Sequence, residues 1–428
     1  MKPPFPPLKA ASHLTPSLSS RLSFSPYTSR ELIMDPASQS DPIQSTEEDY
    51  VELPYFNLTD AELSAIEAET RQVADRVREL YANGVPFFTR SAIQDLVHQI
   101  DRATQRFQDE GPAGICGQTF SLQGLDGKTV EVDIEIGKTV RLRGTRELVF
   151  GLASKDPFLN YQTYQHLTSC HSEPSSFSPE LAYCPLYILH HSSLRDITTG
   201  QIIHDYKYEP LESVQRAFDT ISQTWADGED CRRLKSALAA VSIPKTITKI
   251  VAFACSTMSI SNGIGQRSSI IQHALMLTIR DFLQGRNDQP GVEITCYAQD
   301  PQYTEEDAAV LQNAGITVIG DPRGFLEVDD SSVVMSFAAD IPVRQIVADL
   351  ARPAILIWDQ VKGEEETLRD WSGRIPGKTW ETLEELEGMM GDPDSPRLRE
   401  IIRKEYVEMG GLLDENVFGQ STIHIRRS

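Results

Sequence analysis

The sequence lacks any apolar run close to the roughly 18 residues that a membrane-spanning helix requires, so it predicts no such helix. It is also poor in basic residues, because 40 Lys and Arg stand against 62 Asp and Glu, giving a net charge of −22 over 428 residues. A surface with this charge repels phosphate backbones and anionic lipid heads. The composition therefore disfavours nucleic acid and membranes, and leaves a protein partner or a small molecule as the candidate partners.

Cysteine is scarce, and no two cysteines lie close together in the sequence. The six cysteines occupy positions 116, 170, 184, 231, 255 and 296. This usage is typical of reducing compartments and does not suggest a disulfide framework. It predicts a cytoplasmic and/or nuclear protein.

Acidic residues are missing from the first 30 positions, which hold four basic residues and many serines. That composition is typical of a mitochondrial transit peptide, which makes the mitochondrion the alternative location. Several prolines in the same stretch would break the amphipathic helix that such a signal needs. Because so few apolar residues cannot repay the entropy of ordering, residues 1–50 are predicted to be a disordered tail.

What the sequence does contain is an alternation of strand and helix patterns between residues 246 and 359. Short links between these patterns force parallel strand pairing and right-handed crossovers. Thr304 is expected to cap one helix, with Asp307 completing a capping box. The predicted fold class is α/β, with a Rossmann-like parallel sheet as the core and helices on both faces. The expected strands are residues 250–255, 292–297, 316–319, 332–337 and 354–358, and the expected helices include 266–283 and 342–350.

The segments around this core complete the predicted domain organisation. Residues 51–206 are expected to form an N-terminal α+β region, with a helix capped by Ser91 and a hairpin that turns at Asp126-Gly127. Residues 207–361 hold the Rossmann-like domain. The acidic residues 362–428 are expected to be a helical segment with a frayed end. Histidines and cysteines between residues 154 and 206 match no established zinc spacing, so no metal site is predicted.

The candidate ligand site follows from the general rule that open parallel sheets bind ligands at the carboxyl ends of their strands. Here those ends offer Cys255, Ser256 and Thr257 after the first strand and Asp300 after the second. A carboxylate in the second position suits the ribose hydroxyls of a nucleotide-type ligand. The alternative is that Asp300 only begins an Asp-Pro turn.

The glycine fingerprint of dinucleotide-binding folds is missing from the turn after the first strand. Without glycine, backbone amides cannot approach a pyrophosphate closely, so NAD is disfavoured. S-adenosylmethionine carries no phosphate and stays a candidate cofactor, although the sequence identifies none.

A nucleophilic enzyme is also disfavoured. No Gly-x-Ser-x-Gly elbow surrounds Cys255 or Ser256. The nearest base on a helix is His273, which is expected to be a partly exposed residue two helical turns away. The sequence therefore predicts no catalytic residue.

Two stretches of the core read CYAQDPQYTEEDAAVLQNAGITVIGDP and VVMSFAADIPVRQIVADLARPAILIWD. They resemble the SRR-like domain family, named for the plant phenotype "sensitivity to red light reduced", and look closest to its fungal branch. The resemblance covers residues 234–361. Two departures concern possible activity: the family's glycine-bearing first turn is Ala254-Cys255-Ser256 here, and its Pro-His-Cys-like element after the fourth strand is replaced by residues 338–342.

The resemblance implies a regulatory role, such as light and clock signalling or control of haem biosynthesis, and attaches no firm reaction to the domain. The first functional hypothesis is therefore a non-enzymatic regulatory protein. The alternative is an S-adenosylmethionine-dependent, methyltransferase-like enzyme that uses the crevice at Cys255, Ser256, Thr257 and Asp300.

Overall fold

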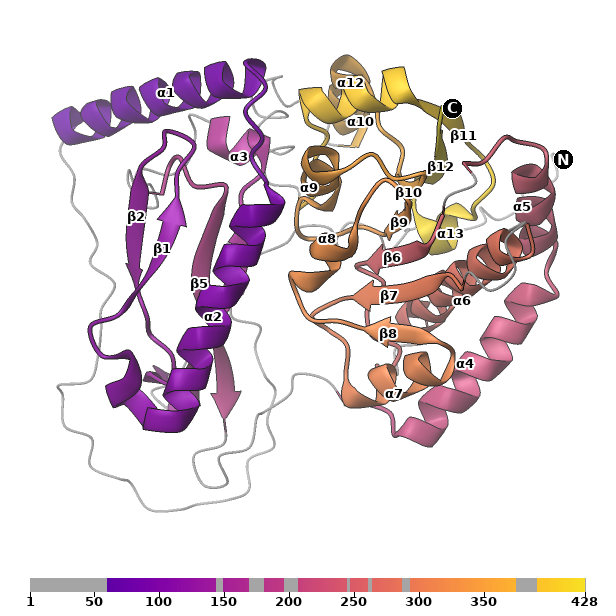
Figure 1. Ribbon diagram of the computed structural model, residues 1–428, viewed down its shortest axis with the longest axis horizontal. Coiled ribbons are helices and arrows are strands. Elements are labelled where there is room, and N and C mark those ends of the chain that lie inside the picture. Colours follow the sequence, from indigo (N-terminus) through magenta and orange to yellow (C-terminus); the bar gives the residue numbers. More distant parts are fainter. Residues whose placement is uncertain are drawn as a thin grey trace, which may run out of the picture. The chain divides into compact units, whose positions relative to one another are not determined.

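The computed structural model describes residues 60–143, 149–168, 181–195, 207–244, 247–260, 264–286, 293–374 and 391–427. Within these residues, the predicted core strands join one seven-stranded sheet in the order β11-β12-β10-β9-β6-β7-β8 (Figure 1). Neighbours from β10 to β8 are parallel, whereas β12 runs antiparallel to both β10 and β11. The strands are β6 (Lys249–Phe253), β7 (Thr295–Gln299), β8 (Ile316–Val318), β9 (Ser332–Ser336), β10 (Ile355–Asp359), β11 (Tyr406–Met409) and β12 (Ser421–Arg426).

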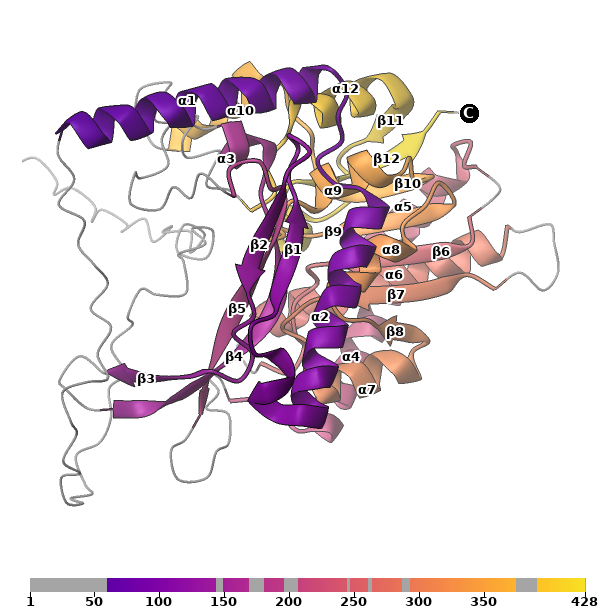
Figure 2. The same ribbon diagram turned by 60° about the vertical axis from the view of Figure 1, so that its left-hand side comes forward.

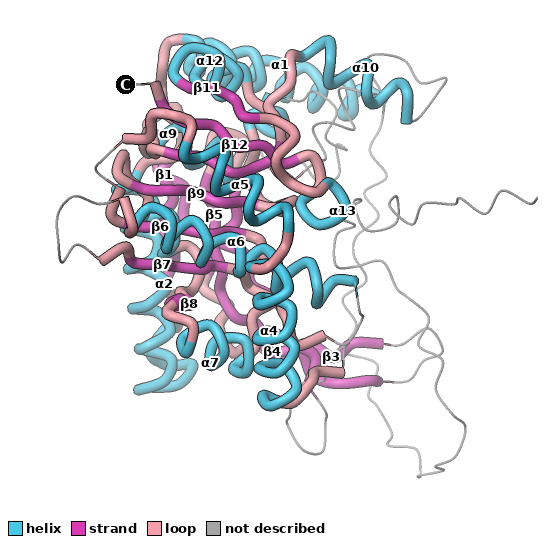
Figure 3. Tube along the Cα trace, turned by 90° about the vertical axis from the view of Figure 1, so that its right-hand side faces the viewer, coloured by secondary structure: helices cyan, strands magenta, loops and turns pink. Residues whose placement is uncertain are grey.

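Among the parallel strands β6 to β10, the direction in which strands are added reverses once. From β6 the chain adds β7 and β8 on one side, then returns to add β9 and β10 on the other. Figure 3 shows β9, β6, β7 and β8 side by side in that order. The reversal lies between β6 and β9, and such a switch point opens a crevice at the carboxyl ends of the strands. The predicted Rossmann-like sheet is confirmed.

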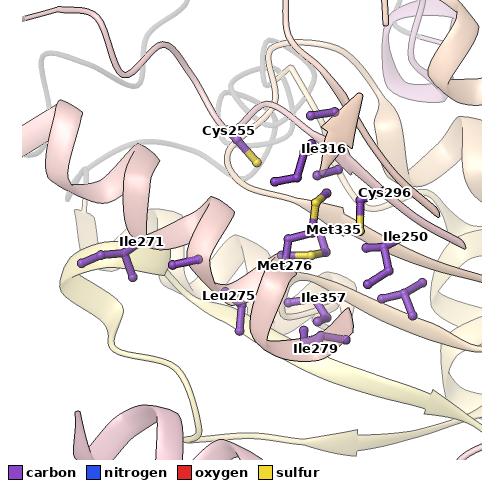
Figure 4. Packing of buried hydrophobic residues seen from close by; sticks show 14 of the residues in the cluster. Ile250, Cys255, Ile271, Leu275, Met276, Ile279, Cys296, Ile316, Met335 and Ile357 are labelled. Atoms are coloured by element: carbon purple, nitrogen blue, oxygen red, sulfur yellow. The ribbon is translucent and has the colours of Figure 1, made fainter. Parts of the chain in front are cut away.

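Both faces of the sheet are covered, because its strands bury side chains in both directions. Ile250, Met335 and Ile357 belong to an apolar cluster with residues of α4, α5, α6, α7 and α13 (Figure 4). Val251 and Val334 point the other way and join a second cluster with residues of α8, α9 and α12. The helices are α4 (Leu211–Ala226), α5 (Glu229–Ala239), α6 (Ile264–Gln284), α7 (Glu305–Asn313), α8 (Arg323–Glu327), α9 (Val343–Leu350), α10 (Glu364–Arg374), α12 (Pro396–Glu405) and α13 (Glu415–Phe418).

The N-terminal region adds its own apolar residues to the second cluster. Its helix α2 runs beside α8 (Figure 2). Arg90, at the start of α2, donates hydrogen bonds to the carbonyls of Leu326 and Val328 at the end of α8. Asp349 of α9 accepts hydrogen bonds from the backbone amide of Phe87 at 2.7 Å and from that of the next residue. The elements of this region are α1 (Asp60–Ala82), α2 (Arg90–Glu110), a 3-10 turn (Gly111–Ile115), β1 (Thr119–Gln123), β2 (Thr129–Asp133), β3 (Thr139–Arg143), β4 (Val149–Tyr161), α3 (Tyr164–Thr168) and β5 (Leu186–Arg195).

Several local predictions are confirmed and others are corrected. The hairpin across Asp126-Gly127 forms from β1 and β2. Thr89, and not Ser91, caps α2, because the Thr89 side chain accepts a hydrogen bond from the backbone of Ala92 at 3.2 Å. Residues 1–50, predicted as a disordered tail, lie outside the described residues. In the part of the chain that is described, no helix is long and apolar enough to cross a membrane.

The C-terminal segment is more than the helical stretch that its composition suggested. It contributes β11 and β12 to the sheet, and β12 is buried where a frayed end was expected. Ile423 pairs with Ile357 of β10, far away in the sequence. A six-residue strand of this kind is stabilised by its neighbours rather than by its own propensity, and its partners cannot be read from local sequence.

Candidate functional site at the carboxyl edge of the sheet

The candidate site lies where β6, β7 and β9 end. Ala254 follows β6, Asp300 follows β7 and Ala338 lies two residues beyond β9. Because β6 is hydrogen-bonded to both β7 and β9, these three exits are neighbours at one edge of the sheet. These turns therefore lie at the switch point of the sheet, the place where open parallel sheets bind their ligands.

Three residues of these turns have a backbone that glycine adopts more readily. Ala254, Ser256 and Ala338 have positive φ angles of 55°, 61° and 53°, in the left-handed region. For a residue with a Cβ atom, that conformation costs roughly 1–2 kcal/mol. Ala254 and Ser256 belong to the turn where the sequence resemblance implied glycine. Strained backbone of this kind gathers at functional sites, where the surrounding structure holds it in place.

Relief of this strain gives a first prediction. Ala254→Gly is expected to raise the free energy of unfolding by roughly 0.5–1 kcal/mol, since the relief of left-handed strain exceeds the entropic cost of glycine. Urea denaturation measures the change. Ala252→Gly is the matched control, because Ala252 is a buried residue within β6. This variant should lower the free energy of unfolding by about 1 kcal/mol. An equal loss in both variants would show that Ala254 is not strained.

Asp300 holds the two turns together. Its Oδ2 accepts a hydrogen bond from the backbone N–H of Ser256 at 2.7 Å, and its Oδ1 accepts one from that of Gln302 at 2.8 Å. Burial raises the pKa of Asp300, the two backbone hydrogen bonds act against this rise, and the nearby carboxylate of Asp340 adds to it. A carboxylate has about four acceptor positions, so roughly two stay open to a ligand. Asp300 thus forms the predicted turn, and the geometry leaves its proposed ligand role available.

The three candidates after β6 do not share one environment. Ser256 is exposed, and its Oγ donates to the side-chain oxygen of Gln302 at 2.9 Å. Cys255 is buried in the apolar cluster, as Figure 4 shows, and burial raises the pKa of its thiol far above the usual range. Thr257 is also buried and donates to Asp307 at 2.5 Å. Of the four candidates, Ser256 and Asp300 are the two that are not buried.

His273 corrects the expectation of a partly exposed residue, because it is fully buried. Its Nδ1 lies 2.7 Å from the carbonyl oxygen of Ser269, which can only accept, so Nδ1 carries the proton. Its Nε2 then accepts the hydroxyl proton of Tyr303, also at 2.7 Å. Burial lowers the pKa of His273 to about 4, so the ring is neutral at physiological pH. Both ring nitrogens are occupied, which leaves His273 no free nitrogen to act as a base in the crevice.

Asp307 is the residue whose wider role the sequence did not reveal. The predicted capping box is confirmed, with Thr304 as N-cap of α7. In addition, the buried Asp307 carboxylate accepts hydrogen bonds from the backbone N–H of Met258 at 2.9 Å and from Ser259 Oγ at 3.0 Å. It therefore ties the start of α7 to the loop after β6. The only sequence signal was the capping pattern itself, which names no partner outside its helix.

Comparison with protein families identifies this architecture. Residues 234–424 match the family model described as the SRR1 domain. The chain carries an SRR1 domain. The match runs from α5 to β12, so it extends past residue 361, where the sequence resemblance had stopped. No curated protein matches the chain, and placement in the fungal branch stays a prediction.

The carboxyl edge of the SRR1 domain is acidic. Asp300, Asp321, Asp340 and Asp359 follow or end β7, β8, β9 and β10, respectively. Among the described residues, no three His, Cys, Asp or Glu side chains are placed to hold a metal ion. Of the histidines and cysteines between residues 154 and 206, Cys170, His171 and His204 lie outside the described residues. An acidic edge suits ligands that donate hydrogen bonds or carry positive charge, and it repels phosphate groups.

Proposed function

We propose that this protein is a non-enzymatic regulator whose SRR1 domain binds a small molecule or a protein partner at the switch-point crevice. The observation that carries the proposal is the placement of three strained non-glycine residues, Ala254, Ser256 and Ala338, around that crevice. The family resemblance extends the proposal to signalling, including circadian signalling, or to control of haem biosynthesis. A cytoplasmic and/or nuclear location, with the mitochondrion as the alternative, belongs to the same proposal.

The chemistry of the crevice supports a binding role over a catalytic one. Catalysis by a nucleophile needs an ionised or activated group beside a base. Burial keeps Cys255 in its thiol form, and His273 has both nitrogens engaged. Ser256 is exposed, but its hydroxyl donates to Gln302 and not to a basic group. These side chains therefore supply positions for hydrogen bonding and no activated nucleophile.

A second candidate function is favoured by the strand order. Numbered along the chain, the sheet reads 3-2-1-4-5-7-6, with the last strand, β12, antiparallel beside β10. The first five strands have the order 3-2-1-4-5 that doubly wound nucleotide-binding folds share. The likeness is one of topology and carries no activity by itself. The acidic edge adds support, because S-adenosylmethionine bears a cationic sulfonium and no phosphate. A methyltransferase-like enzyme is thus the alternative.

Substitution of Asp300, followed by calorimetric titration of the protein with adenosine-type ligands, distinguishes these two candidates. If an adenosine-type ligand binds, the open acceptor positions of Asp300 should receive its ribose hydroxyls. Asp300→Asn is expected to weaken binding of S-adenosylmethionine and S-adenosylhomocysteine by at least about tenfold, because a charge-assisted hydrogen bond is lost. One acceptor of the turn is also lost, so the free energy of unfolding should fall by about 1 kcal/mol. Isothermal calorimetry and urea denaturation measure the two effects.

The control removes the same charge elsewhere. Asp281 lies near the C-terminal end of α6, where it pairs with Arg280. Asp281→Asn should therefore leave ligand binding unchanged. NAD should give no heat with either protein. No heat from any of the three compounds, with the wild-type protein folded, would exclude the methyltransferase-like alternative and leave a partner-binding domain. Accumulation of S-adenosylhomocysteine during incubation with S-adenosylmethionine and candidate acceptors would contradict the non-enzymatic assignment.

A further inference from the structure

A closed ring of hydrogen bonds joins the turn after β6, helix α6 and the turn after β7. The Ser269 hydroxyl of α6 donates to the carbonyl of Ser256 at 2.8 Å, and the Ser269 carbonyl accepts from His273 Nδ1 at 2.7 Å. His273 Nε2 accepts from the hydroxyl of Tyr303, also at 2.7 Å. The backbone N–H of Tyr303 donates to the carbonyl of Asp300 at 3.3 Å, and the Asp300 carboxylate accepts from the N–H of Ser256. The ring thus begins and ends at Ser256.

In this ring, the bond between Tyr303 and His273 connects the turn after β7 to α6. His273 is fully buried, and Tyr303 packs against the first apolar cluster, with the two ring centroids 5.7 Å apart. Burial raises the pKa of Tyr303 well above its usual range, so the hydroxyl keeps the proton that it donates. Without this hydroxyl, His273 Nε2 would be buried and unpaired, which is costly. The pair therefore holds the turn after β7 against α6.

The ring determines the geometry of the Asp300 carboxylate. Its two oxygens accept from the backbone N–H groups of Ser256 and Gln302, so its open acceptor positions depend on the spacing of the two turns. Ser256 needs such support, because its left-handed φ of 61° persists only where the surrounding structure holds it. Groups that bind a ligand keep their geometry when packing and hydrogen bonds lock the residues behind them. Tyr303 and His273 provide this support for Asp300 and Ser256.

We propose that Tyr303 and His273 are positioning residues of the switch-point site, which act on a ligand through Asp300 and Ser256. His273 has both ring nitrogens engaged inside the protein, so it has none to offer a ligand directly. The inference rests on the binding function proposed above and extends the site to a second layer of residues. It predicts that loss of the Tyr303 hydroxyl loosens the Asp300 and Ser256 turns more than it loosens the rest of the fold.

Hydrogen exchange at the Ser256 backbone amide tests the positioning role without any ligand. Tyr303→Phe removes the hydroxyl and keeps the ring, so this amide should exchange at least about tenfold faster, because the turn opens locally. Tyr406→Phe is the matched control, since Tyr406 is buried and its hydroxyl donates to the carbonyl of Pro353, which precedes β10, at 2.8 Å. Amides of β9 report global opening and correct for any loss of overall stability. Equal corrected exchange at Ser256 in wild type and Tyr303→Phe would overturn the proposal.

Calorimetric titration with S-adenosylmethionine and S-adenosylhomocysteine tests whether this positioning matters for binding. Tyr303→Phe should weaken binding of both compounds by at least about threefold, because a misdirected acceptor makes a weaker hydrogen bond, while Tyr406→Phe keeps the wild-type affinity. Unchanged affinity in Tyr303→Phe for a compound that the wild type binds would refute the role in binding. If the wild type binds neither compound, the adenosine-type ligand is excluded. Faster exchange at Ser256 then still supports the positioning role, and unchanged exchange overturns it, so the two proposals can fail separately.

Discussion

Arg344→Met is expected to lower the free energy of unfolding by about 3–5 kcal/mol, because it leaves buried charges without their counterion. Arg344 lies in the first turn of α9 and is almost fully buried. Its Nε lies 3.2 Å from Asp392, and its Nη1 lies 2.6 Å from Asp394. Nη1 also donates to the carbonyl of Asp359 at 3.3 Å. Burial lowers the pKa of Arg344, but the three acidic residues together outweigh burial and raise this pKa above its usual range, so the guanidinium stays charged.

Urea denaturation at pH 8 measures this effect. Arg76→Met is the matched control, since Arg76 pairs with Glu79 on the exposed side of α1, with side chains 50% and 59% exposed. Such a surface pair contributes at most about 1 kcal/mol. Adding Asp392→Asn and Asp394→Asn to the Arg344 variant removes the stranded charges and should recover part of the loss. Equal losses for Arg344→Met and Arg76→Met would contradict the buried-charge explanation.

Arg344, together with Asp392 and Asp394, fixes the loop before α12 at the end of β10. Besides the ion pairs, Gln345 donates to the carbonyl of Pro393 at 2.9 Å, and Asp394 accepts from the backbone N–H of Lys362 at 3.1 Å. Gly391 of the same loop lies so close to Asp340 that a Cβ atom would come within 2.4 Å of its Cα. The loop therefore joins α9, β10 and the turn after β9. Loss of Arg344 should loosen this side of the carboxyl edge together with the fold.

Local signals account for what could be predicted from the sequence. The capping box of Thr304 and Asp307 spans one helical turn, so its pattern was sufficient to place the start of α7. Asp126-Gly127 between two alternating stretches identified the β1–β2 hairpin for the same reason. Short links between strands and helices fixed the parallel direction of the core strands. Each of these inferences depends on residues that are close along the chain.

Contacts between distant residues account for what could not be predicted. The pairing of β12 with β10 joins residues near 355 to residues near 425, and the local sequence of neither segment indicates that the two pair. The burial of His273 depends on Tyr303, which follows the next strand. The exit of β6 shows the same limit: Cys255, Ser256 and Thr257 could be placed at the carboxyl edge, but not assigned to the interior or the surface. That choice depends on the left-handed turn at Ala254 and Ser256.

Acidification from pH 7 to pH 4 is expected to remove stability through two buried histidines. Burial lowers the pKa of both His273 and His424 from 6.5 to about 4, and the charge of Arg344 adds to the effect on His424. The unfolded chain therefore binds protons near pH 6.5, while the folded chain stays neutral at these positions until about pH 4. The sign of the pH dependence follows from this difference. The contribution of each neutral histidine to the free energy of unfolding is complete above pH 6.5 and is lost as the pH falls towards 4. Each histidine contributes on the order of 3 kcal/mol.

The measurement is the difference between variant and wild type, because buried carboxyl groups with a raised pKa act in the opposite direction. Burial raises the pKa of Asp392, so its contribution is present at low pH and is lost as the pH rises. Urea denaturation of His424→Leu and wild type at several pH values cancels that shared background. The variant should lose less stability than the wild type between pH 7 and pH 4, by on the order of 3 kcal/mol. His98→Leu, which removes an exposed histidine from α2, should run parallel to the wild type. A His424→Leu profile that also runs parallel would show that His424 takes up its proton equally well in the folded and unfolded chains, and that burial does not hold it neutral.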